Sequence, residues 1–355
     1  MRFVCVLACL LLSYAATGQA QDASAHDHDV PAAPSDRPTV SVRGFTDINF
    51  SQTDDEHSPD GFALGQFAGQ LSASLGAKVH FFGETSVTAR STAFTVEVER
   101  AILRYDYNDH FKLSVGRYHT PINYWNTAFH HGLWLQTTAS RPDMIQTGGT
   151  FQPVHFVGLL AEGTVGSPSL GLGYNAGVGN GRGSAISRAG DAGDVNRNRA
   201  WLLKLFARPS SLYGVELGGA AYHDVIAIAG TDGYPELITS AYAALTSETP
   251  EVIAEFTNVR HHDRATGVDF NSQAFYVQAA VRLPVAPALK PYARYEKMLG
   301  EPAEPVFGNV SGATATFGLR CELAESAALK GEYRHIRRPG GLVVNGVYLQ
   351  TALTF

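Results

Sequence analysis

The chain has 355 residues, of which 45% are hydrophobic, 17% charged and 10% aromatic, and its formal net charge at pH 7 is -6. The charged fraction is well below the roughly 25% of an average soluble domain, and the acidic balance excludes the basic stripe expected of a nucleic-acid binder. After the first 20 residues no run approaches the roughly 18 uninterrupted apolar residues of a membrane helix, so few charges and many glycines favour a sheet protein with apolar residues spread by alternation.

The first 20 residues have the three parts of a secretory signal peptide. Arg2 is followed by the apolar run from Phe3 to Leu12 and then by the small-residue exit Gly18-Gln19-Ala20. This order predicts export of the chain, with a signal peptide over residues 1–20 and cleavage after Ala20. Cleavage removes two of the three cysteines and leaves Cys321, so no disulfide within the chain can staple the mature fold.

Residues 21–38 carry three prolines and little apolar bulk, which predicts a flexible N-terminal segment ahead of the folded part. Within it, His26-Asp27-His28-Asp29 could bind a divalent metal weakly. A solvated tail is the interpretation we favour, because nothing nearby would preorganise the ligands.

From residue 39 to residue 355 the chain alternates between apolar and polar residues, which is typical of strands with two different faces. Val40, Val42 and Ile48 share one face of the first segment, while Arg43 and Asp47 share the other. Tight turns alternate with connections that are usually longer and more polar. The expected tight turns are residues 76–78, 108–109, 166–169, 209–214, 247–250, 284–288 and 324–327, and the other connections are 51–61, 91–93, 119–150, 180–198, 224–236, 260–271, 299–309 and 338–342.

Counting the segments between these connections gives about sixteen strands, an even number as in bacterial single-chain barrels. The sequence therefore predicts an all-β fold: a closed antiparallel transmembrane β-barrel over residues 39–355, with short periplasmic turns and longer extracellular loops. The segment 21–38 would then lie in the periplasm. A soluble β-sandwich is the alternative, but it would not explain the alternation of tight turns with longer loops.

The last ten residues form an amphipathic segment that ends in an aromatic side chain. Val347, Leu349, Thr351, Leu353 and Phe355 share one face. This pattern resembles the signal by which outer-membrane barrels are recognised for insertion. It predicts localisation in the bacterial outer membrane, surrounded by lipid and lipopolysaccharide, with the outer-membrane assembly machinery as a partner through the strand that ends in Phe355.

The polar face of such a barrel lines its lumen. Candidate lumen cations are Arg43, Arg90, Arg104, Lys112, Lys204, Arg208, Arg282, Lys290, Arg294, Arg320, Lys330 and Arg334, and candidate lumen anions are Asp47, Glu84, Asp106, Glu216, Glu255, Glu296, Glu322 and Glu332. The excess of cations suggests a mild preference for anions. Alternatively, many of these charges pair across strands and leave little field.

Two places break the expected alternation. Glu97 and Glu99 fall out of phase with Arg100 and Arg104, which predicts a bulge in this strand. Pro291 interrupts another run and is expected near a strand end, because proline has no N–H to donate to the sheet.

The longest connection, over residues 118–150, is the candidate constriction of the lumen. It contains two of the three tryptophans, and such aromatic density favours a loop that folds inward. The candidate constriction residues are His119, Tyr124, Trp125, His130, His131 and Trp134. Packing on a neighbouring subunit or at the outer rim is the alternative. We assign no metal to these histidines, since adjacent side chains point in different directions on most backbones.

Four blocks of the sequence resemble a known family. The segment Gly116–Pro121 leading into Tyr124–Gly132 resembles the third-loop region of the phosphate-selective porin O/P-like family, and Tyr174–Gly183, Tyr276–Ala280 and Lys290–Glu296 support the resemblance. It extends in blocks over nearly the whole mature chain and implies a 16-stranded, trimeric outer-membrane porin. Phosphate selectivity in that family rests on arginines and lysines at the constriction. Residues 119–140 contain neither, so we expect a general or differently selective channel.

The sequence contains no motif for catalysis, because Gly-x-Ser-x-Gly and HExxH are absent. We therefore expect no enzymatic activity, no cofactor and no nucleic-acid partner. The predicted function is passive diffusion of small hydrophilic solutes, with a mild anion preference, through a homotrimer. The alternative is a plugged structural or adhesive barrel without significant transport, which the acidic loop residues Asp54, Asp55, Glu56 and Asp60 favour.

Overall fold

The structure is a computed structural model that describes residues 38–355, except residues 59, 130–131, 147–148, 167, 184, 189, 229 and 285–288. The predicted signal peptide and all but the last residue of the segment 21–38, including His26 and His28, lie outside the described residues. None of the described helices is long and apolar enough to cross a membrane.

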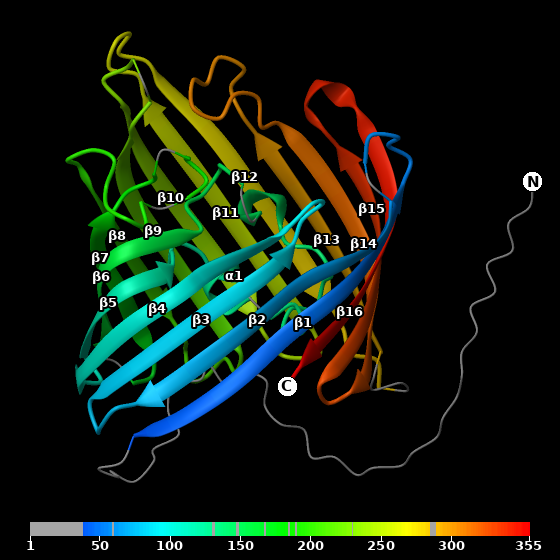
Figure 1. Cartoon of the computed structure of the whole chain (residues 1–355), viewed down its shortest axis with the longest axis horizontal. Helices are drawn as coiled ribbons and strands as arrows, with labels where there is room; N and C mark the ends of the chain where they lie inside the picture. Colours follow the sequence, from blue (N-terminus) through cyan, green and yellow to red (C-terminus); the bar gives the residue numbers. More distant parts are fainter. Residues whose placement is uncertain are drawn as a thin grey trace, which may run out of the picture. The chain divides into compact units, whose positions relative to one another are not determined.

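The described part of the chain forms sixteen β-strands, one short helix and two 3₁₀ turns (Figure 1). The strands are β1 (Thr39–Thr53), β2 (Gly61–Ser74), β3 (Val79–Ala89), β4 (Phe94–Asn108), β5 (Phe111–His119), β6 (His155–Val165), β7 (Leu172–Asn180), β8 (Arg199–Ala207), β9 (Val215–Ile226), β10 (Tyr234–Leu245), β11 (Glu251–His262), β12 (Asp269–Ala280), β13 (Leu289–Leu299), β14 (Gly312–Ala324), β15 (Ala327–Arg337) and β16 (Val343–Thr354). The helix is α1 (Trp125–Ala128), and the 3₁₀ turns are η1 (Asp143–Ile145) and η2 (Pro339–Gly341).

Each strand pairs antiparallel with its neighbours in the chain, and β1 pairs with β16, so that the sheet closes into a barrel. The closing pair runs from Phe45 opposite Thr354 to Thr53 opposite Gly346. Every described strand thus has a hydrogen-bonded neighbour on both sides, which lipid surroundings demand of a spanning sheet. The predicted fold class, a closed antiparallel barrel of sixteen strands, is confirmed.

The connections alternate between the two ends of the barrel. Tight turns lie at the end where β16 finishes, which we call the turn end, and the longer connections lie at the opposite loop end (Figure 1). The loop-end connections are residues 54–60, 90–93, 120–154, 181–198, 227–233, 263–268, 300–311 and 338–342. Each overlaps a connection expected from the sequence, because glycine, proline and short polar side chains mark the strand ends.

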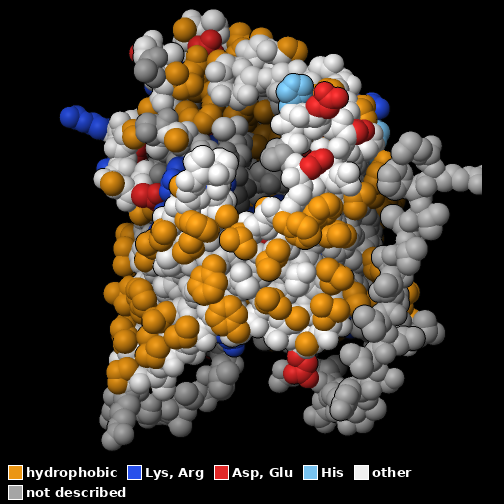
Figure 2. All heavy atoms as spheres, turned by 45° about the vertical axis from the view of Figure 1, so that its right-hand side comes forward, with side chains coloured by type: hydrophobic (Ala, Val, Ile, Leu, Met, Phe, Trp, Pro, Cys, Tyr) orange, Lys and Arg blue, Asp and Glu red, His pale blue; other side chains and the backbone are white. Residues whose placement is uncertain are grey.

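The barrel is apolar outside and polar inside. Outward residues such as Val42, Phe62 and Phe94 leave well over half of their surface exposed. Figure 2 shows hydrophobic side chains in a belt across the visible wall, with charged side chains gathered beyond it at both ends. Inward residues such as Glu84 and Lys330 are buried. This is the reverse of a soluble protein and the arrangement expected of a barrel surrounded by lipid.

Both expected irregularities are present. The register between β3 and β4 shifts next to Glu84, which lies opposite Arg100, and Glu99 is the extra residue of this bulge. The Glu99 carboxylate is buried inside the barrel and accepts a hydrogen bond from Ser86. Glu99 and Arg100 therefore both bond to inward side chains, which strict alternation would forbid. Pro291 is the third residue of β13, near the strand end as expected.

Candidate functional site

We call the connection between β5 and β6, residues 120–154, the inner loop, and its described residues lie inside the barrel. Its helix α1 is seen within the ring of strands (Figure 1). Ile122, Trp125 and Ile145 of this loop are each no more than 1% exposed. The expected constriction over residues 118–150 thus comprises the last two residues of β5 and most of the inner loop.

The first part of the inner loop packs its apolar side chains against strands β10 to β12. The Tyr124 ring lies 5.8 Å from the Tyr242 ring, and the Trp125 ring lies 6.0 Å from the Tyr276 ring at an interplanar angle of 90°. Phe129 packs on Trp125 with 4.9 Å between ring centroids. These residues belong to or border a hydrophobic core inside the barrel. Burial of each large apolar side chain contributes about 1.5–3 kcal/mol, so the aromatic residues fix the loop to the wall.

Glu255 of β11 holds the start of α1. Its carboxylate accepts hydrogen bonds from the backbone N–H groups of Tyr124 (3.0 Å) and Trp125 (2.8 Å) and from the Tyr276 hydroxyl (2.5 Å). Tyr124, at the N-cap position, makes no capping hydrogen bond with its own side chain. The wall therefore supplies the cap, and the N–H groups at a helix start favour an anion there.

Three buried cations of the wall bind backbone carbonyl groups of the inner loop. They are Arg294 of β13, Arg320 of β14 and Lys330 of β15. The acceptors are the carbonyl oxygens of Ser140 and Arg141 for Arg294, of Trp134 and Gln136 for Arg320, and of Leu133 and Thr138 for Lys330. Hydrogen bonds from a charged donor are about twice as strong as neutral ones, so they offset part of the cost of taking these cations out of water.

Carboxylates of the same strands bind donors of the inner loop. Glu332 of β15 accepts from the N–H groups of Ala139 (2.7 Å) and Ser140 (3.1 Å). Glu296 of β13 accepts from the N–H of Asp143 (2.5 Å), and Glu251 of β11 accepts from the Thr137 hydroxyl (2.8 Å). Because cations take the carbonyl groups and carboxylates take the N–H groups, the wall holds the loop through its main chain.

Arg141 links the inner loop to the opposite wall of the barrel. It is the one Lys or Arg between Arg117 and Arg182 in the sequence. Burial lowers the pKa of Arg141 to about 10, and the nearby carboxylates Glu99, Asp47 and Glu84, in that order, oppose the shift. These carboxylates lie on β4, β1 and β3. Sequence reasoning missed Arg141, although a lone cation in a long uncharged loop is a signal for a buried partner.

The predicted lumen charges are largely engaged by partners. The ion pairs that they form, with one another or with charges that were not predicted, are Glu84–Arg100 (2.7 Å), Arg104–Asp106 (2.7 Å), Arg208–Glu216 (2.7 Å), Arg282–Glu322 (2.9 Å), Lys290–Glu251 (2.8 Å), Arg294–Glu296 (3.1 Å) and Arg334–Glu332 (2.7 Å). Lys112 lies 4.0 Å from Asp106, and the buried Lys204 donates to the Asn123 carbonyl at 3.4 Å. Arg43 is exposed, and Arg282 lies in the turn after β12 rather than in a strand.

Several inward charges were missed by the sequence analysis. They are the anions Glu99, Glu162 and Glu251 and the cations Arg100, Arg117 and Arg141. The bulge in β4 hid Glu99 and Arg100, strand phase was not assigned for Glu162, Glu251 and Arg117, and Arg141 lies in a loop, where strand phase does not apply. Anions join the lumen as readily as cations. Pairing across strands, as between Glu84 and Arg100, and pairing within one strand, as between Arg294 and Glu296, together engage most of these charges.

The candidate constriction residues lie in different surroundings. Tyr124 and Trp125 lie in the inner core, and His119 is buried at the end of β5. Trp134 is partly exposed, and its ring lies 5.6 Å from the guanidinium of Arg320. His130 and His131 fall outside the described residues.

A second buried network joins the loops at the loop end. His261 of β11 lies with Nε2 2.9 Å from Glu236 and Nδ1 2.7 Å from Glu304. Arg182, in the connection 181–198, donates two hydrogen bonds to Glu236, of 3.0 Å and 2.9 Å. Glu236 lies on β10 and Glu304 lies in the connection 300–311, so four separate segments meet here. Their distance in the sequence explains why no pattern indicated the network.

Comparison with solved structures found porins over nearly the whole chain. The anion-selective porin from Comamonas acidovorans matches with a TM-score of 0.65 and 11% identity, over 90% of this chain and 100% of that one. OmpF of Salmonella typhi, in complex with daunomycin, matches with a TM-score of 0.64 and 11% identity, over 89% and 97%. The outer membrane channel DcaP of Acinetobacter baumannii matches with a TM-score of 0.62 and 12% identity, over 90% and 97%.

At these identities the likeness establishes the fold, which this chain shares with outer-membrane porins. No protein-family model matches the chain, and neither does any curated protein. The resemblance to the phosphate-selective porin O/P-like family therefore remains a prediction from the sequence blocks.

Proposed function

We propose that this protein is an outer-membrane porin through which small hydrophilic solutes diffuse passively. The observation that carries the proposal is a closed barrel with an apolar outside, a polar inside and a long loop held across its interior. Lipid and lipopolysaccharide would surround the apolar belt, and the turn end would face the periplasm. Export by the predicted signal peptide and insertion by the outer-membrane assembly machinery are parts of the same proposal.

The solute path follows the wall formed by β2 to β4. Four inward side chains on these strands, Gln66, Gln70, Arg100 and Arg104, are only partly buried, whereas Glu84, Ser86 and Glu99 are buried. Inward side chains on β11 to β14, such as Thr257, are buried. Water therefore reaches one side of the interior more than the other, and this difference supports a passage beside the inner loop rather than through its core.

A weak anion preference is part of the proposal. Two arginines on the partly exposed inner surface lie over aromatic rings: Arg100 is 4.2 Å from the Phe82 ring and Arg334 is 3.8 Å from the Tyr348 ring. A flat, held guanidinium with an exposed edge can bind a passing anion. Each also has a carboxylate partner, Glu84 or Glu332, so we expect the preference to be mild.

A homotrimer is the assembly we propose. OmpT of Vibrio cholerae has been solved in a trimer form, and it matches this chain with a TM-score of 0.59 and 13% identity, over 90% of this chain and 100% of that one. Native mass spectrometry of the protein released from a mild detergent would test the assembly, because a trimer has three times the mass of the mature chain and a monomer would contradict it.

A closed barrel without significant transport is the second candidate. The observation that favours it is the reach of the inner loop, which bonds to strands β8, β10, β11 and β13 to β16. Such a loop leaves less room than one attached to a single side.

Recording from planar bilayers separates the two candidates. A porin gives stepwise conductance, and proteoliposomes that contain it swell in isotonic solutions of small sugars. A closed barrel gives neither. The reversal potential in a salt gradient then measures selectivity, and we expect a small shift toward the anion equilibrium potential. A clear cation preference would contradict the proposed role of Arg100 and Arg334.

A further inference from the structure

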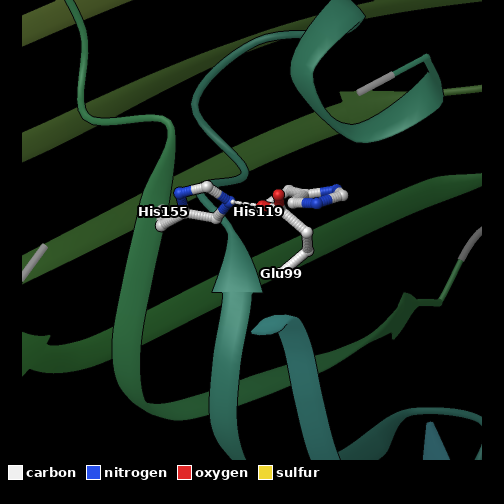
Figure 3. A group of neighbouring side chains, drawn as sticks. All are labelled: Glu99, His119 and His155. Carbon is white, nitrogen blue, oxygen red and sulfur yellow. Dashed lines mark ion pairs between the residues drawn. The ribbon is translucent and has the colours of Figure 1, made fainter. Parts of the chain in front are cut away.

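Three side chains with metal-binding groups meet at the base of the inner loop. Glu99 comes from the bulge of β4, His119 is the last residue of β5, and His155 is the first residue of β6. His119 and His155 are direct partners across the two strands. Figure 3 shows the carboxylate and the two imidazole rings turned toward one another.

The geometry of the three groups is close to that of a metal site. One ligand atom from each residue lies within 4.8 Å of the other two, and Nε2 of His155 is 2.9 Å from Oε2 of Glu99. The imidazole centroids are 5.6 Å apart. Zinc holds nitrogen and oxygen ligands at about 2.0–2.2 Å, so ligand atoms at tetrahedral positions lie about 3.4 Å from each other. The limit of 4.8 Å exceeds that spacing, so binding an ion would draw the three ligand atoms together.

The surroundings suit a cation. Glu99, His119 and His155 are all buried, and Ser86 donates a hydrogen bond to Glu99. A held carboxylate of this kind presents its second oxygen in a fixed direction. A second carboxylate, that of Glu84, lies 3.5 Å from Nε2 of His119.

The charged groups next to Glu99, His119 and His155 favour a positive ion. The carboxylates of Glu84, Glu99 and Asp47 are balanced in part by the guanidinium groups of Arg100 and Arg141. Lys330 also acts on Asp47, so with both imidazoles neutral, as metal ligands must be, the formal charges of this wider set sum to zero. The charged groups in direct contact with the imidazoles are the carboxylates of Glu99 and Glu84, and these attract a divalent ion.

We propose that Glu99, His119 and His155 form a binding site for a divalent transition-metal ion of the zinc class. Two imidazole nitrogens and one carboxylate oxygen are a ligand set of catalytic zinc sites, in which a fourth position stays open to water. Here the site carries out no reaction. Its three ligands tie β4, β5 and β6 together where the inner loop leaves the wall and returns to it.

The placement gives the ion a structural effect. His119 and His155 directly flank residues 120–154, the whole inner loop. A bound ion would link the two ends of the loop to each other and to the bulge of β4. This would stabilise the folded barrel in proportion to the logarithm of the ion concentration above its dissociation constant. The effect does not depend on whether the barrel transports solutes.

No metal site was predicted here from the sequence, in which His119 shares the connection 119–150 with only His130 and His131. The partners supplied by the fold are Glu99 and His155, which lie 20 residues before and 36 residues after His119 in the sequence. Strand pairing and a bulge bring them together, and neither can be read from spacing alone.

Metal titration of the folded protein tests the proposal. The mature chain carrying His26→Ala and His28→Ala removes the N-terminal histidines as competing ligands. After treatment with EDTA and its removal, Co²⁺ is added and its visible ligand-field absorption is followed, and Zn²⁺ is then used to displace it. We expect one tight equivalent per chain. Absence of any saturable binding overturns the proposal.

Variants test which residues bind the ion. We expect His155→Gln and Glu99→Gln each to weaken Co²⁺ binding at least tenfold. The matched control is His262→Ala, which removes an exposed histidine paired with an aspartate, Asp269, at 2.9 Å, and we expect it to bind Co²⁺ as the parent does. The heat-dependent shift in gel mobility typical of barrels reports whether each variant is folded. Unchanged affinity for Co²⁺ in folded variants overturns the proposal. The contact between His155 and Glu99 would then be only an ion pair.

X-ray absorption of the zinc-loaded parent protein keeps the proposal testable if the variants fail to fold. We expect a first shell of nitrogen and oxygen atoms with the outer-shell scattering of two imidazoles. A spectrum without imidazole scattering would place the ion elsewhere and overturn the assignment.

Discussion

Gly44 of β1 and Phe355 exchange both backbone hydrogen bonds, from Gly44 N to Phe355 O at 2.7 Å and from Phe355 N to Gly44 O at 3.0 Å. The Phe355 ring lies over Gly44, in the space that a Cβ at that position would occupy. It also lies 5.7 Å from the Phe67 ring of β2. An aromatic ring laid over a glycine of the neighbouring strand seals the point where the first strand meets the last.

Replacement of Gly44 by valine is expected to weaken barrel closure, because the new side chain displaces the Phe355 ring. We expect slower folding into detergent micelles or liposomes and a lower temperature for loss of the heat-stable gel form. Gly69→Val is the matched control, since Gly69 lies directly opposite Gly44 on β2 and has open space around its Cβ position. Equal behaviour of the two variants would contradict the proposed role of the ring.

Truncation of the inner-loop tryptophans is expected to raise single-channel conductance in planar bilayers. Trp125→Ala removes a fully buried side chain from the inner core, which costs about 3–5 kcal/mol of local packing and loosens the loop. Trp134→Ala removes a partly exposed ring and should raise conductance by a smaller factor. Trp201→Ala on the outer face of β8, where the ring is 44% exposed, is the control. Unchanged conductance in both loop variants would rule out the constriction.

Lys330→Met is expected to loosen the inner loop at Leu133 and Thr138, while Arg320 still holds the carbonyl groups of Trp134 and Gln136. The substitution removes the donor to the carbonyl groups of Leu133 and Thr138, and buried groups left without a partner cost about 1–3 kcal/mol each. Current recordings should show a noisier open state. Lys78→Met, in the exposed turn before β3, makes the same chemical change away from the loop and should leave the noise as it is in the parent.

Glu255→Gln is expected to detach α1 while keeping the shape of the side chain. The neutral amide can no longer accept hydrogen bonds at both oxygen positions, so at least one of the N–H groups of Tyr124 and Trp125 loses its partner. A hydrogen bond to a charged group contributes about 1.5–3 kcal/mol. Proteolysis of the inner loop should become faster, while the gel mobility of the folded barrel stays the same. Equal proteolysis of variant and parent would show that packing alone holds α1.

At the loop end, the contact between the connection 54–60 and the connection 338–342 is expected to be lost in acid. The N–H of His57, the Ser58 hydroxyl and the Arg338 guanidinium lower the pKa of Asp55 from 3.8 to about 2. Because the folded value lies below the unfolded one, the carboxylate stabilises this contact fully above about pH 4 and loses its effect as the pH falls toward about 2. Carboxyl NMR would follow the titration of Asp55, and Arg338→Gln should raise the pKa of Asp55. An unshifted pKa in that variant would mean that the salt bridge, 2.8 Å long, is not maintained in solution.

The sequence was most informative about the wall of the barrel. Alternation with a period of two placed Val42 and Arg43 on opposite faces, and glycine, proline and short polar residues placed the connections. These signals are local, so they can be interpreted without knowing which strands pair. The bulge near Glu99 was also visible, because one extra residue shifts the alternation on one side of it.

The interior was less predictable, because it depends on contacts between distant residues. The alternation predicts that Lys330 is a lumen cation. Nothing in the neighbouring sequence indicates that it will donate to two carbonyl groups of the inner loop. Likewise, His155 becomes a neighbour of His119 only through strand register. The count of lumen charges alone therefore does not show which of them are engaged, since the path of the inner loop decides this.

The wall recognises the inner loop at its carbonyl and N–H groups, which every residue type except proline provides. The course of residues 133–141 is thus encoded in the strands and not in the loop itself. An exposed side chain on this stretch that the wall does not bind, such as Leu135, can therefore be exchanged with little change in the path of the loop, which makes that position a natural place to graft new chemistry into the lumen.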